Sequence, residues 1–366
     1  MSRAPIVVHL LAADMPADRL PALIGLLESA TVPWQQVLVA LGEGPLPIPN
    51  GRKVERLHAP VPCDHVRRLI LSRYLHRCGA RNGLLILHAW SPLAGRWACE
   101  LAATHRPLLV EVPPSGDSRL VARWAATRCV SLVCPSATVR AELIATGAPP
   151  THCVVIRPPV DADRLSTRHR PTVRARLNLA DRDSAILVLP PLARRTGALV
   201  AAWGAMLLEK VRPQTRLVIP ADGRETERIR RLVAACRHEW MTRFAPPELE
   251  LCDLLVGADL AIYLPSGSAP PTAPAWAAAA RRPLVAADVP SITELFADGQ
   301  TAWLCPALDP QQAARRLLHA LEHPAQSRRL AEQAAAIADL FKPARALSQY
   351  ALAYQRLATR RPVADV

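Results

Sequence analysis

The chain has 366 residues, half of them hydrophobic, which is enough for two ordinary domains with a core each. Its 45 basic and 31 acidic residues leave a net charge of +14, but eight Trp, four Tyr and three Phe offer few rings for base stacking, so the surplus favours contact with an anionic membrane over nucleic acid. No apolar run approaches the ~20 residues that cross a bilayer and residues 1–5 lead straight into a strand-like segment, so we expect a cytoplasmic protein that can lie at the inner face of the membrane.

In the first half, short apolar runs alternate with longer segments of helical period, which is typical of a parallel sheet built from βα units. The predicted strands are 6–11, 37–41, 84–88, 108–112, 131–134 and 154–156. The predicted helices are 18–28, 64–78, 92–104, 119–128 and 136–146. Ser136 is expected to cap the last of these helices, and Gly147 is expected to end it.

A polar stretch with three prolines, Arg157 to Asp183, follows and predicts a domain boundary. A second alternating series then begins. Its predicted strands are 185–189, 216–219, 260–263, 284–286 and 302–304, and its predicted helices are 197–208, 225–236, 248–256, 272–280, 310–323, 327–340 and 344–359. The sequence therefore predicts an α/β protein with two doubly wound parallel-sheet domains and a cleft between them.

The nine cysteines are scattered and none forms a C-x-x-C pair, so we expect reduced, mostly buried thiols and neither a disulfide nor a zinc site. Asp161-Ala162-Asp163 has the D-x-D spacing of some metal sites, but its place in the boundary segment favours a structural role. No metal and no cofactor is predicted. His9 and His88 each lie at the end of a predicted strand, and without a visible partner we interpret them as interior histidines rather than catalytic bases.

Several segments are similar to the fingerprints of the family-4-type, or group 1, glycosyltransferases of GT-B fold. They are LLILHAWSPLAG at 84–95, the segment 130–147, VVIRPPVDADRL at 154–165, Leu264-Pro265-Ser266, Pro283 to Ala286, Glu294-Leu295, Asp298-Gly299 and the last helix with Tyr354. The resemblance covers nearly the whole chain. It implies a GT-B fold with an acceptor-side domain at 1–158, a linker at 159–183, a donor-side domain at 184–340 and a helix at 341–366 that crosses back to the first domain.

The resemblance also implies a nucleotide-sugar donor, but the motifs that would hold it are degenerate. The family binds the donor diphosphate with an Arg and a Lys of the first loop of the second domain. Here that loop reads LPPLARRTG, so prolines replace the Gly-Arg pair and Thr196 stands in place of lysine. Arg194 and Arg195 can offer a substitute fork to a phosphate, although a solvated pair is the interpretation that we favour. The next motif keeps Asp222 and Gly223.

The family's E-x7-E pair is replaced by Ser268 and Trp276, and Trp276 is expected to be a packed helix residue. Pro270, Pro271 and Pro274 lie where the following helix begins and remove N–H donors that a phosphate would need, while Ser266 and Ser268 are expected to cap that helix. Pro113 stands where the family often has a histidine. The candidate donor-binding residues are Arg194, Arg195, Gly197, Asp222, Gly223, Ser266, Ser268 and Glu294, and no catalytic residue is assigned.

Two functions remain open from the sequence. One is a glycosyltransferase, of hexosyltransferase type, that works through an altered donor site. The other is a glycosyltransferase-like protein that lacks transfer activity and serves as a binding or scaffold protein, and the five substitutions at Pro113, Pro191, Thr196, Ser268 and Trp276 favour it. The acceptor is expected to meet loops such as 43–52 and 113–119, whose residues do not indicate its chemistry.

Overall fold

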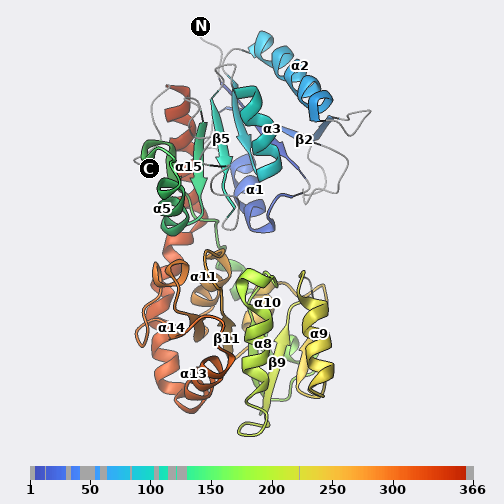
Figure 1. Cartoon of the computed structure of the whole chain (residues 1–366), viewed down its shortest axis with the longest axis vertical. Coiled ribbons are helices and arrows are strands. Elements are labelled where there is room, and N and C mark those ends of the chain that lie inside the picture. Colours follow the sequence, from blue (N-terminus) through green and yellow to red (C-terminus); the bar gives the residue numbers. More distant parts are fainter. Residues whose placement is uncertain are drawn as a thin grey trace. The chain divides into compact units, whose positions relative to one another are not determined.

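The structure is a computed structural model that describes residues 5–12, 14–29, 34–41, 54–57, 64–82, 85–102, 107–113, 121, 130–221 and 223–359. The chain forms two compact units (Figure 1). Unit 1 comprises residues 1–159 together with 343–366, and unit 2 comprises residues 160–342. Within the described ranges, no helix is both long and apolar enough to cross a membrane.

Unit 1 is built on a seven-stranded parallel sheet in the order β3-β2-β1-β4-β5-β6-β7. Its strands are β1 (Ile6–Leu11), β2 (Gln35–Leu41), β3 (Val54–Leu57), β4 (Leu85–Ala89), β5 (Leu108–Glu111), β6 (Val130–Cys134) and β7 (Cys153–Val155). Its helices are η1 (Ala17–Arg19), α1 (Leu20–Glu28), α2 (Asp64–Asn82), α3 (Pro92–Ala102), α5 (Ala137–Ala145), η2 (Pro150–His152) and α15 (Pro343–Ala358). The core on one sheet face includes α2, α3 and α5, and the core on the other includes α1 and α15.

The six predicted strands of this unit are confirmed, with ends that move by one or two residues. Ser136 caps α5 by accepting the N–H of Val139 at 3.2 Å, and Gly147 ends it with a positive φ of 104°, as predicted. Strand β3 was not predicted. The predicted helix 119–128 lies outside the described residues apart from Val121, as do the expected acceptor loops 43–52 and 113–119 apart from Pro113.

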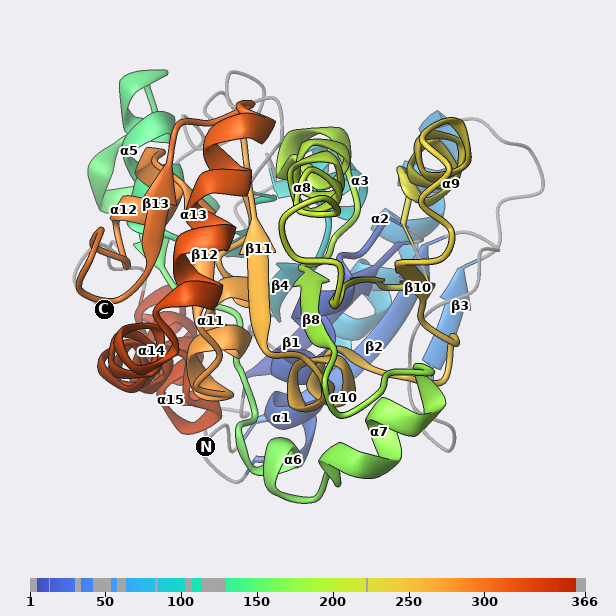
Figure 2. The same cartoon turned by 90° about the horizontal axis from the view of Figure 1, so that it is seen from below.

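Unit 2 contains a six-stranded parallel sheet in the order β10-β9-β8-β11-β12-β13 (Figure 2). Its strands are β8 (Ser184–Val188), β9 (Thr215–Ile219), β10 (Thr242–Phe244), β11 (Leu260–Tyr263), β12 (Leu284–Ala287) and β13 (Trp303–Cys305). Its helices are α6 (Asp163–Ser166), α7 (Arg170–Arg176), η3 (Arg194–Thr196), α8 (Ala198–Met206), α9 (Thr226–Ala235), α10 (Leu251–Gly257), α11 (Thr272–Ala279), α12 (Pro290–Thr293), α13 (Pro310–Glu322), α14 (Pro324–Ala338) and η4 (Asp339–Phe341).

Two apolar cores cover the two faces of the unit 2 sheet. Helices α8, α9 and α13 contribute to one core, and α7, α10, α11 and α14 contribute to the other. Figure 2 shows α8 and α13 on the opposite side of the strands from α10 and α11. The fold class predicted from the sequence, α/β with two doubly wound parallel sheets, is therefore observed in each unit.

Helices α6 and α7 belong to the polar segment between the two alternating series. Ion pairs join this segment to α10 and to its N-cap residue. Arg164 pairs with Glu250, and Arg168 pairs with Glu250 and Asp253 at 3.2 Å each. Asp161 accepts the N–H of Asp163 at 3.3 Å, so the D-x-D carboxylate is used in the turn before α6. Glu250, Cys252 and Asp253 also bring three potential metal-ligand atoms within 4.8 Å of one another, but the arginines already pair with both carboxylates.

Candidate functional site

The crevice that ligands use in a doubly wound sheet lies where the strand order reverses, outside the carboxyl ends of the strands. In unit 2 the chain runs from β8 to β9 and β10 on one side and returns to β11 on the other side of β8. The loops that follow β8 and β11, residues 189–197 and 264–271, therefore border the predicted crevice. We call these the β8 loop and the β11 loop.

Thr196 holds the β8 loop together and is itself only 3% exposed. Its Oγ1 lies 2.5 Å from Pro191 O and 2.8 Å from Ala193 O, and it accepts the N–H of Ala193 at 3.1 Å. A buried hydroxyl with three backbone partners inside one loop is a structural group. The residue that stands in place of the family's lysine therefore closes the loop instead of reaching toward a phosphate.

The β8 and β11 loops meet at Gly197. This residue has φ of +67°, and a Cβ placed on it would lie 1.8 Å from the carbonyl oxygen of Leu264. Ser266 donates its N–H to the carbonyl of Arg195 at 3.0 Å, which ties the loops together a second time. Only glycine permits both the left-handed backbone and this close approach, so Gly197 determines how the β8 loop and the β11 loop meet.

The loop after β9 also reaches the β8 loop. A Cβ on Gly223 would lie 2.3 Å from the Cβ of Leu192, so this glycine too permits a close approach. Asp222 lies outside the described residues. Arg194 and Arg195 are both exposed and lie on η3, and the backbone of Arg195 contacts Ser266. The structure thus brings Arg195 into contact with Ser266 and Gly197 into contact with Leu264, and Gly223 packs against the same β8 loop.

The first turn of α11 differs from the expected capping. The N-cap is Pro271 and no side chain caps the helix, so the prediction that Ser266 and Ser268 cap it is wrong. Pro270 and Pro271 lie directly before α11, and Ser266 and Ser268 lie three or more residues before its start. Pro274 occupies the third helical position. Thr272 and Ala273 are consequently the two residues of the turn that carry N–H groups, which limits an anion site there.

The remaining candidates lie on neighbouring elements. Ser291, on α12, donates its hydroxyl to the carbonyl of Gly267 in the β11 loop at 2.9 Å. Glu294 follows α12 as its C-cap and is half-buried. Trp276 is half-buried on α11 and packs against the core, as predicted for a packed helix residue. Its indole carries no acceptor and cannot replace a carboxylate that binds sugar hydroxyls.

Sequence reasoning missed a buried polar cluster in unit 1, next to that unit's own strand-order reversal between β1 and β4. The cluster consists of His9, Arg19, Gln36, His88, Trp90, Glu111, Tyr350 and Tyr354. Apart from Gln36 its side chains are at most 2% exposed. The one available signal was Glu111, an acidic residue at the end of the apolar run LLVE.

Glu111 is the centre of the cluster. Arg19 Nη1 lies 3.0 Å from its Oε2, while Tyr350 donates to Oε1 at 2.6 Å and His88 Nε2 lies 3.3 Å from Oε1. Burial alone would raise the pKa of Glu111, but Arg19, His88 and Tyr350 together hold it below its ordinary value. The carboxylate is therefore ionised and joins α15 to β5.

The two histidines are interior groups, as predicted. Trp90 Nε1 can only donate, so His9 Nδ1, 2.9 Å away, accepts, and His9 Nε2 donates to Gln36 Oε1 at 2.9 Å. Burial and the neighbouring His88 lower the pKa of His9 to about 3. Burial also lowers the pKa of His88, whose Nδ1 lies 2.7 Å from the hydroxyl of Tyr354. Both rings are neutral at ordinary pH, and both are fixed by partners within unit 1.

The cluster predicts that unit 1 loses stability as pH falls. The unfolded chain binds protons on His9 and His88 near pH 6.5, whereas the folded chain resists them down to about pH 3 for His9. Below about pH 4.5, protonation of Glu111 adds a second loss, because its pKa is also lowered in the folded state. The free energy of unfolding should therefore fall from about pH 6.5 downward, as measured by urea denaturation at a series of pH values.

A variant His9→Gln should show a shallower decline between about pH 6.5 and pH 4, since one titrating group is removed. An unchanged slope would contradict the role assigned to this ring.

Two units, each with a doubly wound parallel sheet, are the architecture of the GT-B class of proteins. Residues 170–336 match the family model of the glycosyl transferases group 1. This span lies within unit 2 and includes both the β8 loop and the β11 loop, so the similarity to the group 1 glycosyl transferases is carried by unit 2. No curated protein matches the chain.

Several solved structures are similar to this chain over the residues of both units. Alr3699/HepE of Anabaena, solved in complex with UDP and glucose, has a TM-score of 0.79 and 16% identity over 95% of this chain and 99% of its own. Sucrose-phosphate synthase of Thermosynechococcus elongatus has a TM-score of 0.76 and 18% identity over 98% of this chain and 100% of its own. A glycosyltransferase of Rickettsia africae has a TM-score of 0.77 and 12% identity over 97% and 99% of the two chains. These similarities confirm the predicted GT-B fold.

Proposed function

We propose that unit 2 binds a nucleotide-sugar in the crevice between the β8 and β11 loops, and that the chain acts by binding rather than by efficient sugar transfer. The observation that carries this is Thr196, whose hydroxyl is buried among carbonyls of its own loop where the family has a lysine. The donor class is supported by HepE, which was solved with UDP-glucose. The acceptor-side role of unit 1 and a cytoplasmic location belong to the same proposal.

The expected loss of transfer activity follows from the shortage of groups that can stabilise negative charge on the leaving group. A leaving nucleoside diphosphate develops negative charge that cations and N–H groups must stabilise. With lysine absent from the β8 loop and two N–H groups in the first turn of α11, this stabilisation is small. Each missing charge-assisted hydrogen bond costs about 1.5 to 3 kcal/mol, which is roughly tenfold or more in binding or rate.

A second candidate is an active glycosyltransferase in which Arg194 and Arg195 bind the diphosphate. It is favoured by the exposure of both arginines and by the contact of the Arg195 carbonyl with Ser266, which places the pair where the two loops meet. A guanidinium binds a phosphate through two parallel hydrogen bonds. Both candidates share the donor crevice and differ in whether the sugar is transferred.

Thermal-shift titration with UDP, GDP and UDP-glucose tests the nucleotide-binding crevice that both candidate functions require. A ligand at a hundred times its Kd stabilises by about 2.7 kcal/mol. We expect stabilisation by a uridine nucleotide, and the variant Arg194→Ala with Arg195→Ala should weaken it by about tenfold or more if the pair binds phosphate. Arg328→Ala with Arg329→Ala, an exposed pair on α14, is the matched control and should bind as the wild type does.

A transfer assay separates the two candidates. Release of UDP from UDP-glucose at or near the uncatalysed rate, in the presence of bound nucleotide, supports the binding function. Turnover that disappears in the double arginine variant and persists in the α14 control establishes the second candidate. A thermal-shift series without any response to nucleotides would refute the donor crevice itself.

A further inference from the structure

Helix α8 lies on the surface of unit 2 yet has no polar face. Residues 198–208 contain no polar side chain, although a surface helix normally carries a hydrophilic side. Trp203, Leu207 and Val211 are 48%, 44% and 58% exposed. Because they are spaced by four, they lie along one side of the helix and of the turns that continue it. We call these three residues the α8 stripe.

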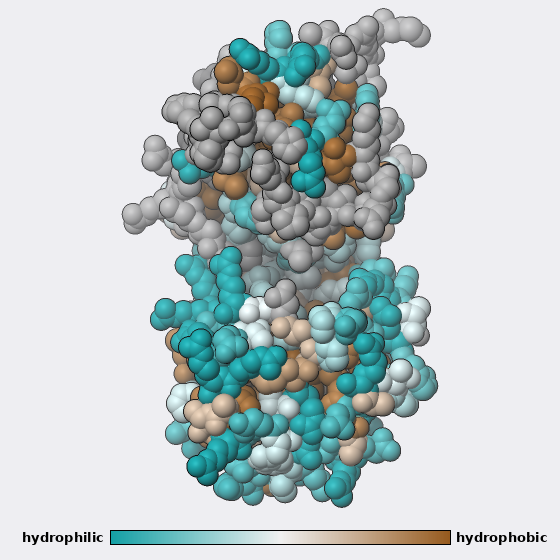
Figure 3. All heavy atoms as spheres, turned by 90° about the vertical axis from the view of Figure 1, so that its right-hand side faces the viewer, coloured by the Kyte–Doolittle hydropathy of each residue, from teal (hydrophilic) through white to brown (hydrophobic). Residues whose placement is uncertain are grey.

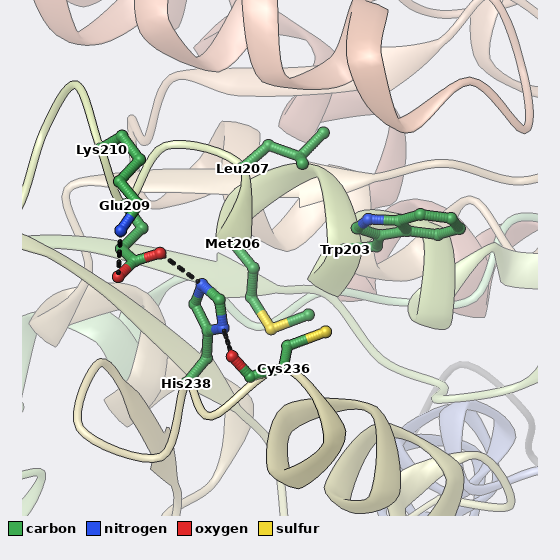
Figure 4. Close-up of a pocket in the computed structure, with 7 residues that line it drawn as sticks. All are labelled: Trp203, Met206, Leu207, Glu209, Lys210, Cys236 and His238. Atoms are coloured by element: carbon green, nitrogen blue, oxygen red, sulfur yellow. Dashed lines mark hydrogen bonds and ion pairs between the residues drawn. The ribbon is translucent and has the colours of Figure 1, made fainter.

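A hollow of about 170 Å³ adjoins the stripe (Figure 4). Trp203, Met206 and Leu207 line it from α8, and Cys236 lines it from the end of α9. Glu209, Lys210 and His238 also line it, and His238 Nε2 lies 3.0 Å from Glu209 Oε2. The exposed apolar surface is therefore continued by a recess with an apolar wall and a charged wall.

Basic residues border this surface. Segments 209–216 and 237–243 supply the basic border, which consists of Lys210, Arg212 and Arg237, and the same segments carry the acidic residues Glu209 and Glu239. Arg216 and Arg243 face the other side of the sheet, where Arg216 pairs with Asp183 at 3.0 Å and Arg243 donates to the carbonyl of Asn178, so they do not belong to this border. The segments are neighbours, since the Arg216 guanidinium lies 5.5 Å from the ring centre of Trp240 and the Lys210 and His238 side chains share the hollow. Trp240 is 44% exposed, and the Lys210 side chain is 86% exposed.

We propose that the α8 stripe and its basic border dock unit 2 on an anionic lipid membrane. Exposed Trp and aliphatic side chains enter the boundary between headgroups and acyl chains, while Lys and Arg remain at the anionic headgroups. Figure 3 shows one face of the molecule, on which brown apolar patches of unit 2 lie scattered among teal hydrophilic surface.

The docking surface does not compete with the nucleotide crevice. Lys210 and Trp240 precede β9 and β10, so the basic border lies at the amino ends of these strands. The β8 and β11 loops lie at the carboxyl ends of parallel strands, which is the opposite edge of the same sheet. Unit 2 can therefore lie on a membrane with its crevice loops uncovered, and the inference stands apart from the proposed function.

Co-sedimentation with lipid vesicles tests the docking surface. Vesicles of phosphatidylcholine with about 30% phosphatidylglycerol should bind the full chain, and vesicles of pure phosphatidylcholine should bind it more weakly. The triple variant Trp203→Ser, Leu207→Ser, Val211→Ser should bind the anionic vesicles at least about tenfold more weakly. Lys210→Ala should weaken binding less, and raised salt should weaken binding of the wild type.

Leu352→Ser is the matched control, because Leu352 is as exposed as Leu207, at 44%, but lies on α15 of unit 1. It should bind vesicles as the wild type does. The far-ultraviolet circular dichroism and melting temperature of each variant show that the fold is intact. Failure of the wild type to bind anionic vesicles would overturn the proposal, as would equal binding by the folded triple variant. Self-association that the triple variant abolishes, without vesicle binding, would assign the stripe to a second copy of the chain.

Discussion

Replacing Glu111 by alanine is expected to lower the free energy of unfolding of unit 1 by about 3 to 5 kcal/mol, which is the cost of breaking a buried ion pair by removing one partner. Arg19 and Glu111 are each 2% exposed and lie 3.0 Å apart, so the variant would leave an uncompensated guanidinium in the core. Tyr350 and His88 would lose their acceptor as well. Urea denaturation at neutral pH measures the loss.

An exposed ion pair provides the matched comparison. Glu227 and Arg231 are 68% and 76% exposed on α9, so Glu227→Ala should change the free energy of unfolding by no more than about 1 kcal/mol. The double variant Arg19→Met, Glu111→Leu should recover much of the stability lost in Glu111→Ala, because it removes both charges together. Equal losses in the single and double variants would show that the ion pair is not the cause.

Gly197→Ala is expected to abolish nucleotide binding by unit 2 and to destabilise it by more than about 3 kcal/mol. The added methyl group would lie 1.8 Å from the carbonyl oxygen of Leu264, and that oxygen belongs to backbone rather than to a flexible side chain. The β8 and β11 loops would have to separate, which removes the crevice along with the contact between Ser266 and Arg195. Thermal unfolding and a UDP titration together measure both effects.

Gly147→Ala is the control that separates the effect of the steric clash at position 197 from the effect of a positive φ alone. Gly147 also has a positive φ, of 104°, but a Cβ there would meet nothing within 4 Å. The substitution should therefore cost only the backbone strain, about 1 to 2 kcal/mol, and leave nucleotide binding intact. Similar losses in the two variants would mean that conformation, and not the close approach of the loops, explains the need for glycine at 197.

The sequence predicted the central strands of both sheets but missed an edge strand of each. Strands buried on both faces read as continuous apolar runs, such as IVVHLL in β1 and LAIY in β11. Strand β3 reads VERL and β10 reads TRF; both lie at the edge of a sheet and are only partly buried. A strand that is only partly buried does not need a continuous run of apolar residues. The hydrophobic pattern of the sequence therefore did not indicate β3 or β10.

The part of the candidate donor site that consists of short sequence motifs could be predicted from the sequence. Comparison with the family pattern predicted that Thr196 stands in place of a lysine and that Trp276 stands in place of a carboxylate. The cluster around Glu111 could not, because its partners lie 23 and 239 residues away, at His88 and Tyr350. The capping error had a similar origin: the prolines before α11 carry the chain into the helix without a serine cap, and no spacing rule anticipates that route.

The order of the elements along the chain also constrains how the protein is made. Unit 1 consists of two pieces, and the whole of unit 2, residues 160–342, is inserted between them. The ends of the insert are joined by a hydrogen bond of 2.7 Å from Val160 N to Phe341 O. During synthesis, Glu111 and His88 cannot contact Tyr350 and Tyr354 until α15 has been made, which happens after the whole of unit 2. Unit 2, being continuous, can therefore finish folding first, while the half-built unit 1 keeps charged groups and the α1 face open to chaperones.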